Sequence, residues 1–157
     1  MSYESASSVT VELIMSRNVV AIERNATVRQ AASLMEEKRR GCLIVVFGSQ
    51  AIGIITERDI VHKVTSEGID PSKVLVQDIM STPLITVDRN ATLLKVAEQM
   101  SEFNVRKIVV VDQTGKLIGL VTSGDLAKWL AAQENYANPT LNAMARIRRG
   151  SIANPYG

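Results

Sequence analysis

The chain carries two copies of one segment, 65 residues apart, and this duplication limits its possible folds more than any other feature of the sequence. Residues 24–27, Arg-Asn-Ala-Thr, recur unbroken as residues 89–92, and residues 14–16, Ile-Met-Ser, recur as residues 79–81. Further matches follow in the same order: Ala32, Met35, Val45 and Val46 recur as Ala97, Met100, Val110 and Val111. A duplication of this length predicts two similar structural units, which we call the first and second repeat.

Each repeat has the pattern of a β-α-β-β-α unit. A short β-rich run, residues 19–22 or 84–87, precedes a helix that should begin after Thr27 or Thr92. A threonine hydroxyl at that place can accept a hydrogen bond from the free amides of the first helical turn. Two β-branched runs joined by a short turn then predict a hairpin, over residues 43–55 and 108–121. A second helix is expected at about residues 58–65 and 124–133.

The first helix of each repeat should bury one face. Apolar residues recur there at positions i, i+3, i+4 and i+7, which places them on one side of an α-helix. They are Val28, Ala31, Ala32 and Met35 in the first repeat and Leu93, Val96, Ala97 and Met100 in the second. We expect both sets in the hydrophobic core.

The expected fold class is α/β, more narrowly α+β, with the two motifs packed about a pseudo-twofold axis. A unit of about 55 residues with one three-stranded sheet buries too little apolar surface to be stable alone, so the two should share a core. The expected boundaries are a flexible N-terminus at 1–9, a first motif at 10–67, a connector at 68–73, a second motif at 74–133 and a basic C-terminal tail at 134–157.

Composition argues against several classes of protein. The 157 residues include one cysteine, Cys42, and one histidine, His62, so neither an intrachain disulfide nor a Cys/His zinc site can form within the chain. No run approaches the ~18 consecutive apolar residues of a membrane span, and the polar start MSYESASSVT lacks the order of a signal peptide. We therefore expect a cytoplasmic protein without a membrane partner.

Each repeat contains the pattern apolar-Gly-apolar-apolar-Thr-x-x-Asp, formed by Gly53, Thr56 and Asp59 and again by Gly119, Thr122 and Asp125. A glycine in a strand lets a planar base or a neighbouring backbone come close. The threonine presents a hydroxyl, the carboxylate could accept both hydroxyls of a ribose, and the first amides of the helix could bind phosphate. The same spacing is also that of a helix-capping motif, and the two roles can coexist.

The paired motifs make the chain resemble two cystathionine-β-synthase (CBS) domains in tandem, the arrangement called a Bateman module. The resemblance covers residues 10–133 and rests on IMSRNVVAIERNATVRQAASLM, GCLIVVF and AIGIITERDIV in the first repeat, and on IMSTPLITVDRNATLLKVAEQM, VRKIVVVD and KLIGLVTSGDLAKWL in the second. It implies a regulatory module that needs no cofactor, commonly dimerises and binds AMP, ADP, ATP or S-adenosylmethionine in clefts between its motifs. AMP is the ligand that we expect first.

The family pattern, transferred residue by residue, implies two unequal nucleotide sites. One consists of Thr56, Arg58 and Asp59 with Ile85, Thr86, Arg106 and Lys107, the last two as phosphate ligands. The other consists of Thr122, Ser123 and Asp125 with Val20 and Ala21, and the positions that match Arg106 and Lys107 there hold Gly41 and Cys42. The resemblance therefore predicts that the Asp59 site binds a phosphorylated adenosine more tightly than the Asp125 site.

Two other classes of function have less support in the sequence. For an enzyme, the Gly48 to Gly53 spacing lacks the Lys and Ser/Thr of a phosphate-binding loop, and His62 alone cannot supply a catalytic arrangement. A nucleic-acid- or protein-binding regulator could use the tail. Its three arginines, Arg146, Arg148 and Arg149, are few cations for binding the phosphates of a nucleic acid. We expect instead a homodimer, with the helical faces of Val64 and Trp129 in its interface, and an unidentified protein target.

Overall fold

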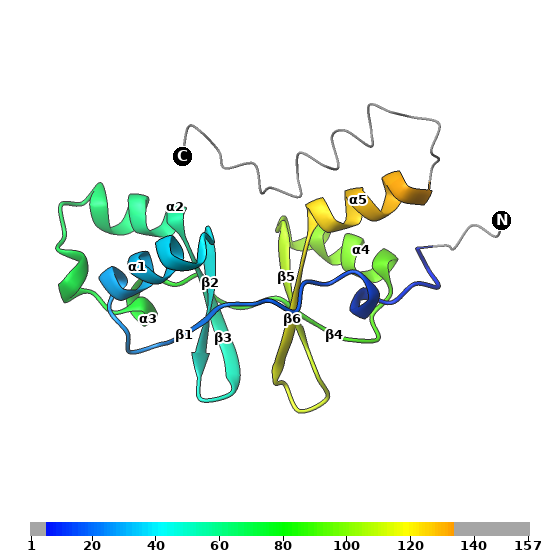
Figure 1. Ribbon diagram of the computed structural model, residues 1–157, viewed down its shortest axis with the longest axis horizontal. Helices are drawn as coiled ribbons and strands as arrows, with labels where there is room; N and C mark the ends of the chain where they lie inside the picture. Colours follow the sequence, from blue (N-terminus) through cyan, green and yellow to red (C-terminus); the bar gives the residue numbers. More distant parts are fainter. Residues whose placement is uncertain (1–5, 134–157) are drawn as a thin grey trace. The chain divides into compact units, whose positions relative to one another are not determined.

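The computed structural model describes residues 6–133, so the basic tail and its arginines lie outside the described residues. Over this range the chain is a mixed α+β structure with two three-stranded sheets (Figure 1). It divides into two compact units. Of the described residues, unit 1 holds 6–16, 87–110 and 119–133, and unit 2 holds 17–86 and 111–118. The segment around Met15, which opens the first repeat in the sequence, therefore belongs to the unit that holds most of the second repeat.

The sheet of unit 2 consists of β1 (Ala21–Glu23), β2 (Cys42–Phe47) and β3 (Gln50–Thr56), in that order. β1 runs parallel to β2, with Ala21 opposite Ile44, and a parallel pair requires a crossover connection. Helix α1 (Val28–Lys38) supplies that connection. β2 and β3 are antiparallel and form the expected hairpin, with Leu43 opposite Ile55.

Threonine caps begin the first helix of both repeats, as the sequence predicts. The Thr27 hydroxyl accepts from the Gln30 amide at 3.1 Å, and the Gln30 side-chain oxygen accepts from the Thr27 amide at 2.9 Å, which completes a capping box. In the second repeat the Thr92 hydroxyl accepts from the Lys95 amide at 3.2 Å. There the return bond is missing, since a lysine has no acceptor to offer.

Short helices complete unit 2. After β3 the chain forms α2 (Glu57–Ile60), which continues as one stretch of π-helix, η2 (Val61–Thr65), where the sequence predicts a single helix. A 3-10 turn, η3 (Pro71–Lys73), and α3 (Val76–Ile79) follow. The sheet and helices of unit 2 contribute to one hydrophobic cluster, made of Ile22, Val28, Ala31, Met35, Leu43, Val45, Ile55, Val64, Val76 and Ile79.

The second sheet repeats the plan with β4 (Thr86–Asp88), β5 (Lys107–Val111) and β6 (Leu117–Thr122), and its helices are α4 (Leu93–Phe103) and α5 (Ser123–Gln133). Leu93, Val96, Met100, Ile108, Val110 and Val121 are buried. The N-terminal segment adds η1 (Val11–Leu13) to this unit. The segment expected to be flexible is held at residues 6 and 9, whose carbonyl oxygens each accept a hydrogen bond of 2.9 Å from α4.

The expectations that Ala32 and Ala97 lie in the core and that Val64 contributes to a dimer interface were wrong. Ala32 and Ala97 are exposed, and the buried stripe of each helix is limited to positions i, i+3 and i+7. Val64 is fully buried in the cluster of its own unit and so offers no surface to a dimer interface. Trp129 is partly buried, and its place in a dimer interface stays a prediction. The cores themselves are as predicted, with Met35 and Met100 both inside.

Candidate functional site

The first Thr-x-x-Asp motif lies where β3 ends and α2 begins, and it forms a complete capping box. The Thr56 amide donates to Asp59 Oδ2 at 2.9 Å, and the Asp59 amide donates to Thr56 Oγ1 at 3.2 Å. Thr56 Oγ1 also donates to Asp59 Oδ2 at 3.0 Å. The helix-capping role that the sequence left open is therefore present in this repeat.

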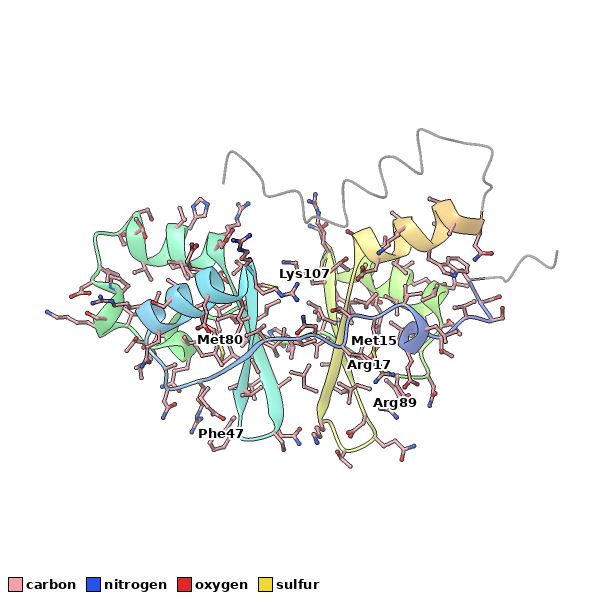
Figure 2. The ribbon with its side chains drawn as sticks, in the orientation of Figure 1. Met15, Arg17, Phe47, Met80, Arg89 and Lys107 are labelled. Atoms are coloured by element: carbon pink, nitrogen blue, oxygen red, sulfur yellow. The ribbon has the colours of Figure 1, made fainter. Side chains whose placement is uncertain are left out.

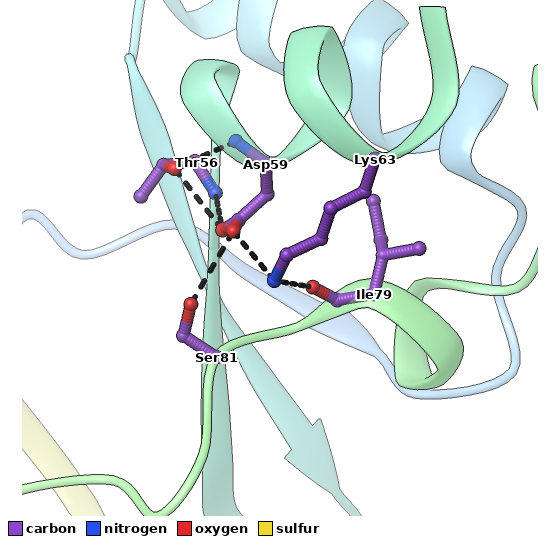
Figure 3. Close-up of polar contacts among 5 residues, drawn as sticks. All are labelled: Thr56, Asp59, Lys63, Ile79 and Ser81. Carbon is purple, nitrogen blue, oxygen red and sulfur yellow. Dashed lines mark hydrogen bonds and ion pairs between the residues drawn. The ribbon is translucent and has the colours of Figure 1, made fainter. Parts of the chain in front are cut away.

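Two further donors reach the other oxygen of the same carboxylate (Figure 3). Lys63 Nζ lies 2.9 Å from Asp59 Oδ1 and also donates to the Ile79 carbonyl at 2.8 Å, while Ser81 Oγ donates to Oδ1 at 3.3 Å. Lys63 comes from the π-helical turn, and Ile79 and Ser81 come from the segment that leads towards β4. The Asp59 carboxylate thus links the start of α2 by hydrogen bonds to the segment that contains Ser81, about 20 positions later in the chain.

Asp59 is the one buried charged residue in the described part of the chain, 7% exposed. An ionised carboxylate offers about four lone-pair sites. Four donors occupy them here: the Thr56 amide, the Thr56 hydroxyl, the Ser81 hydroxyl and the Lys63 ammonium. A buried carboxylate is stable only when it is paired in this way. In this conformation it has no acceptor left for a ribose.

The second motif, where β6 meets α5, has the same cap and fewer additional contacts. The Thr122 amide donates to Asp125 Oδ2 at 2.8 Å, and the Asp125 amide donates to Thr122 Oγ1 at 3.1 Å. Within residues 6–133, no donor besides Thr122 lies within hydrogen-bonding distance of the Asp125 carboxylate. Asp125 is partly exposed. Asp125 therefore keeps most of its acceptor capacity.

The motif glycines are explained by neighbouring chain segments. A Cβ at Gly53 would lie 2.6 Å from Met80 Sδ and 3.2 Å from the Ser81 carbonyl oxygen. A Cβ at Gly119 would collide with Met15 Sδ and lie 3.1 Å from the Ser16 carbonyl oxygen. Figure 2 labels the two methionines. Of the two sequence-based explanations, close approach of a base or of a neighbouring segment, the second is the one observed in both repeats.

The remaining predicted site residues fall in both units. Unit 2 holds the exposed Arg58 together with Val20, Ala21, Ile85 and Thr86. Unit 1 holds Arg106, Lys107 and Ser123, and there the Ser123 amide donates to the Arg106 carbonyl at 2.9 Å. The start of β5 therefore lies beside the start of α5. The grouping of Arg106 and Lys107 with Asp59, and of Val20 and Ala21 with Asp125, stays a prediction.

Sequence reasoning missed Lys63 and Ser81. Lys63 lies four residues after Asp59, the spacing of a helical ion pair, and this signal was available. Ser81 belongs to the repeated Ile-Met-Ser triplet, but its contact with Asp59 depends on the fold and leaves no local signal. Within the described residues, no group of three or more His, Cys, Asp or Glu side chains could hold a metal ion. No helix found there has the length and apolarity needed to cross a membrane.

Comparison with known proteins places these motifs in a family. The model of the CBS domain matches residues 9–66 and 76–132. An uncharacterised protein of Methanopyrus kandleri is 38% identical over 120 residues, which are 76% of this chain and 61% of that protein. The CBS domain-containing protein YhcV of Bacillus subtilis is 34% identical over 118 residues, covering 75% and 83% of the two chains.

Solved structures agree. A CBS domain protein from Burkholderia ambifaria superposes with a TM-score of 0.72 at 33% identity, over 81% of this chain and 97% of that one. A CBS domain protein from Pyrobaculum aerophilum, solved in complex with AMP, superposes with a TM-score of 0.67 at 25% identity, over 74% and 89% of the two chains. From its two repeats, its two sheets and these matches, the chain belongs to the CBS domain family and carries two CBS domains in tandem.

Proposed function

We propose that this chain is a regulatory module that binds an adenosine nucleotide, AMP first, and passes its occupancy to a partner. The observation that supports this most directly is the AMP bound by the Pyrobaculum relative, together with a Thr-x-x-Asp motif at a strand-to-helix junction in each repeat. ADP, ATP and S-adenosylmethionine are further candidates. The role is one of binding rather than catalysis.

The chemistry of the motif fits a nucleoside ligand. A carboxylate with free lone pairs can accept hydrogen bonds from the two adjacent hydroxyls of a ribose. Hydrogen bonds to a charged acceptor are about twice as strong as those to a neutral one. Arg58, Arg106 and Lys107 are cations that neutralise phosphate. A nucleotide changes the arrangement of the module only to the extent that it binds one arrangement more tightly than another. The responding partner is a second copy of the chain or another protein.

A thermal-unfolding panel tests the proposal. The full chain is heated with AMP, ADP, ATP, S-adenosylmethionine or NAD, and with inosine monophosphate as a control for the adenine base. A ligand that binds only the folded state at 100 times its dissociation constant adds about 2.7 kcal/mol to the free energy of unfolding. For a chain of this size that amounts to a rise of several degrees in the midpoint. Equal, near-zero shifts with all of them would contradict nucleotide binding.

A further inference from the structure

The two Thr-x-x-Asp motifs differ in what their carboxylates can offer a ligand. Asp59 is buried and its lone-pair sites are filled by four donors, whereas Asp125 accepts from the Thr122 amide alone among the described residues. Building on the proposed nucleotide binding, we propose that Asp125 accepts the ribose of the nucleotide and that Lys63 acts as an internal competitor for Asp59. This reverses the order of the two sites that the family pattern implies.

Lys63 is the residue that makes the repeats unequal. Its ammonium is held at two points, Asp59 Oδ1 at 2.9 Å and the Ile79 carbonyl at 2.8 Å, so a ribose at Asp59 must break a charge-assisted bond. The corresponding position in the second repeat, four residues after Asp125, is Trp129. An indole cannot form an ion pair with a carboxylate. The serine is the same in both repeats, but among the described residues only Ser81, and not Ser16, donates to the motif carboxylate, so it adds to the difference without a change of residue type.

The two helix starts also differ in the charges beside them, but these charges do not rank the sites, and the order rests on the contacts of the two carboxylates. In unit 1 the start of α5 is joined to the start of β5 by the bond from the Ser123 amide to the Arg106 carbonyl, and Lys107 follows. In unit 2 the matching bond, 3.0 Å long, runs from the Glu57 amide to the Gly41 carbonyl. Here the anionic Glu57 replaces Ser123, and Gly41 and Cys42 replace Arg106 and Lys107, although Arg39 and Arg40 lie directly before this strand start.

Unit 2 has three cations near this helix start that unit 1 lacks: Arg58, matched by Gly124, and Arg39 and Arg40, matched by Asn104 and Val105. Glu57, directly before Arg58 on α2, opposes its charge. In unit 1 the backbone bond places residues 106 and 107 next to the start of α5, the helix whose Asp125 carboxylate has free acceptors. A ligand that combines a diol with a phosphate needs both a free acceptor and nearby cations.

Calorimetric titration of the full chain with AMP tests which carboxylate takes the ribose. Asp125→Asn should weaken AMP binding about tenfold or more, as expected when hydrogen bonds to a charged acceptor are lost, and by more than Asp59→Asn does. Glu98→Gln, which neutralises an exposed carboxylate on α4, is the matched charge control. A larger loss in Asp59→Asn than in Asp125→Asn, with both variants folded by circular dichroism, would overturn the proposal.

A ligand without the diol separates ribose recognition from folding effects. The wild-type chain should bind 2′,3′-dideoxy-AMP more weakly than AMP, and in Asp125→Asn the two ligands should bind equally. In Asp59→Asn the difference between them should persist. If the difference persists in Asp125→Asn and vanishes in Asp59→Asn, Asp59 is the ribose acceptor and the proposal is wrong.

A mirrored pair of substitutions tests Lys63 itself. Lys63→Met removes the competitor and should tighten AMP binding at Asp59, seen as added stoichiometry or a second binding phase. Trp129→Lys places an ammonium four residues after Asp125 and should weaken binding. An unchanged isotherm in Lys63→Met would contradict the role of Lys63. If the wild-type chain binds none of AMP, ADP and ATP, the proposed function fails; if it binds AMP with the reverse mutational order, that function stands and only this inference fails.

Discussion

The two repeats make the same cap and leave their carboxylates in different states. In both, a threonine at the end of a strand exchanges hydrogen bonds with an aspartate three residues later. In the first repeat a lysine and a serine close around that aspartate, and in the second repeat neither of their counterparts does. An identical local motif therefore specifies the helix start, while residues outside the motif decide whether its carboxylate is structural or available to a ligand.

The largest expected effect tests what the repeats share. Gly53→Ala and Gly119→Ala should each lower the free energy of unfolding by about 1–3 kcal/mol, because the added Cβ meets a methionine sulfur and a carbonyl oxygen. The sulfur can move, but the Ser81 and Ser16 carbonyls are held by backbone pairing with Ile54 and Leu120. Urea unfolding measures both variants.

Gly41→Ala is the control for that pair, since its Cβ would lie 3.6 Å from the nearest atom, an ordinary contact. It should leave the free energy of unfolding within about 0.5 kcal/mol of wild type. A tolerated Gly53→Ala beside a destabilising Gly119→Ala would show that the close approach of the segment is a property of one repeat only.

Much of this fold follows from the sequence. The 65-residue duplication, the threonine caps at Thr27 and Thr92 and the hairpins were all readable, because they depend on local chemistry and on period. Strand β1 begins two residues later than predicted, and α3 was not foreseen, because four residues give too little periodicity. The site was readable only to the level of its motif. The state of Asp59 depends on Ser81, 22 residues away, and on which segment the fold brings to it.

The two motif aspartates should contribute unequally to the free energy of unfolding. Asp59→Ala should lower the free energy of unfolding by about 2 kcal/mol, because it leaves the Thr56 amide and its other donors unpaired in a buried place. Asp125→Ala loses only the reciprocal cap and should cost about 1 kcal/mol. The Lys63 side chain is 46% exposed, so the ion pair itself contributes at most about 1 kcal/mol.

Urea unfolding of Asp59→Ala, Lys63→Met and the double variant isolates that ion pair. The sum of the two single effects should exceed the double effect by the coupling between the side chains. Equal losses in Asp59→Ala and Asp125→Ala would remove the structural contrast between the repeats.

A smaller effect concerns the first helix of each repeat. Gln30 closes the capping box of α1, and Lys95 stands in its place on α4. Lys95→Gln should raise the free energy of unfolding by about 0.5 kcal/mol, because it supplies an acceptor for the Thr92 amide and removes a cation from a helix N-terminus. Gln30→Lys should lower it by a similar amount. If Lys95→Gln has no effect while Gln30→Lys destabilises, the start of α4 does not need the second bond of a capping box, from the Thr92 amide to a side chain at residue 95.

The smallest effect lies in the connector, which has no second copy. The Ser72 hydroxyl and amide donate to Asp70 Oδ1 at 2.6 and 2.9 Å, and these bonds, with a lesser contribution from Arg29, lower the pKa of Asp70. Burial acts in the opposite direction and is outweighed. Carbon-detected NMR titration should find the Asp70 pKa below its ordinary value, and Ser72→Ala should move it upwards.

The lowered pKa of Asp70 also predicts how the stability of the folded chain changes with pH. Because its pKa is lower in the folded state than in the unfolded state, its contribution to stability is fully present above the unfolded pKa and is lost as the pH falls through the folded pKa. The wild-type chain should therefore lose slightly more stability than Asp70→Asn does between neutral and acidic pH. If the Asp70 pKa does not respond to Ser72→Ala, the Ser72 hydroxyl does not stabilise the charged carboxylate. The bond from the Ser72 amide would then be the one that lowers the pKa.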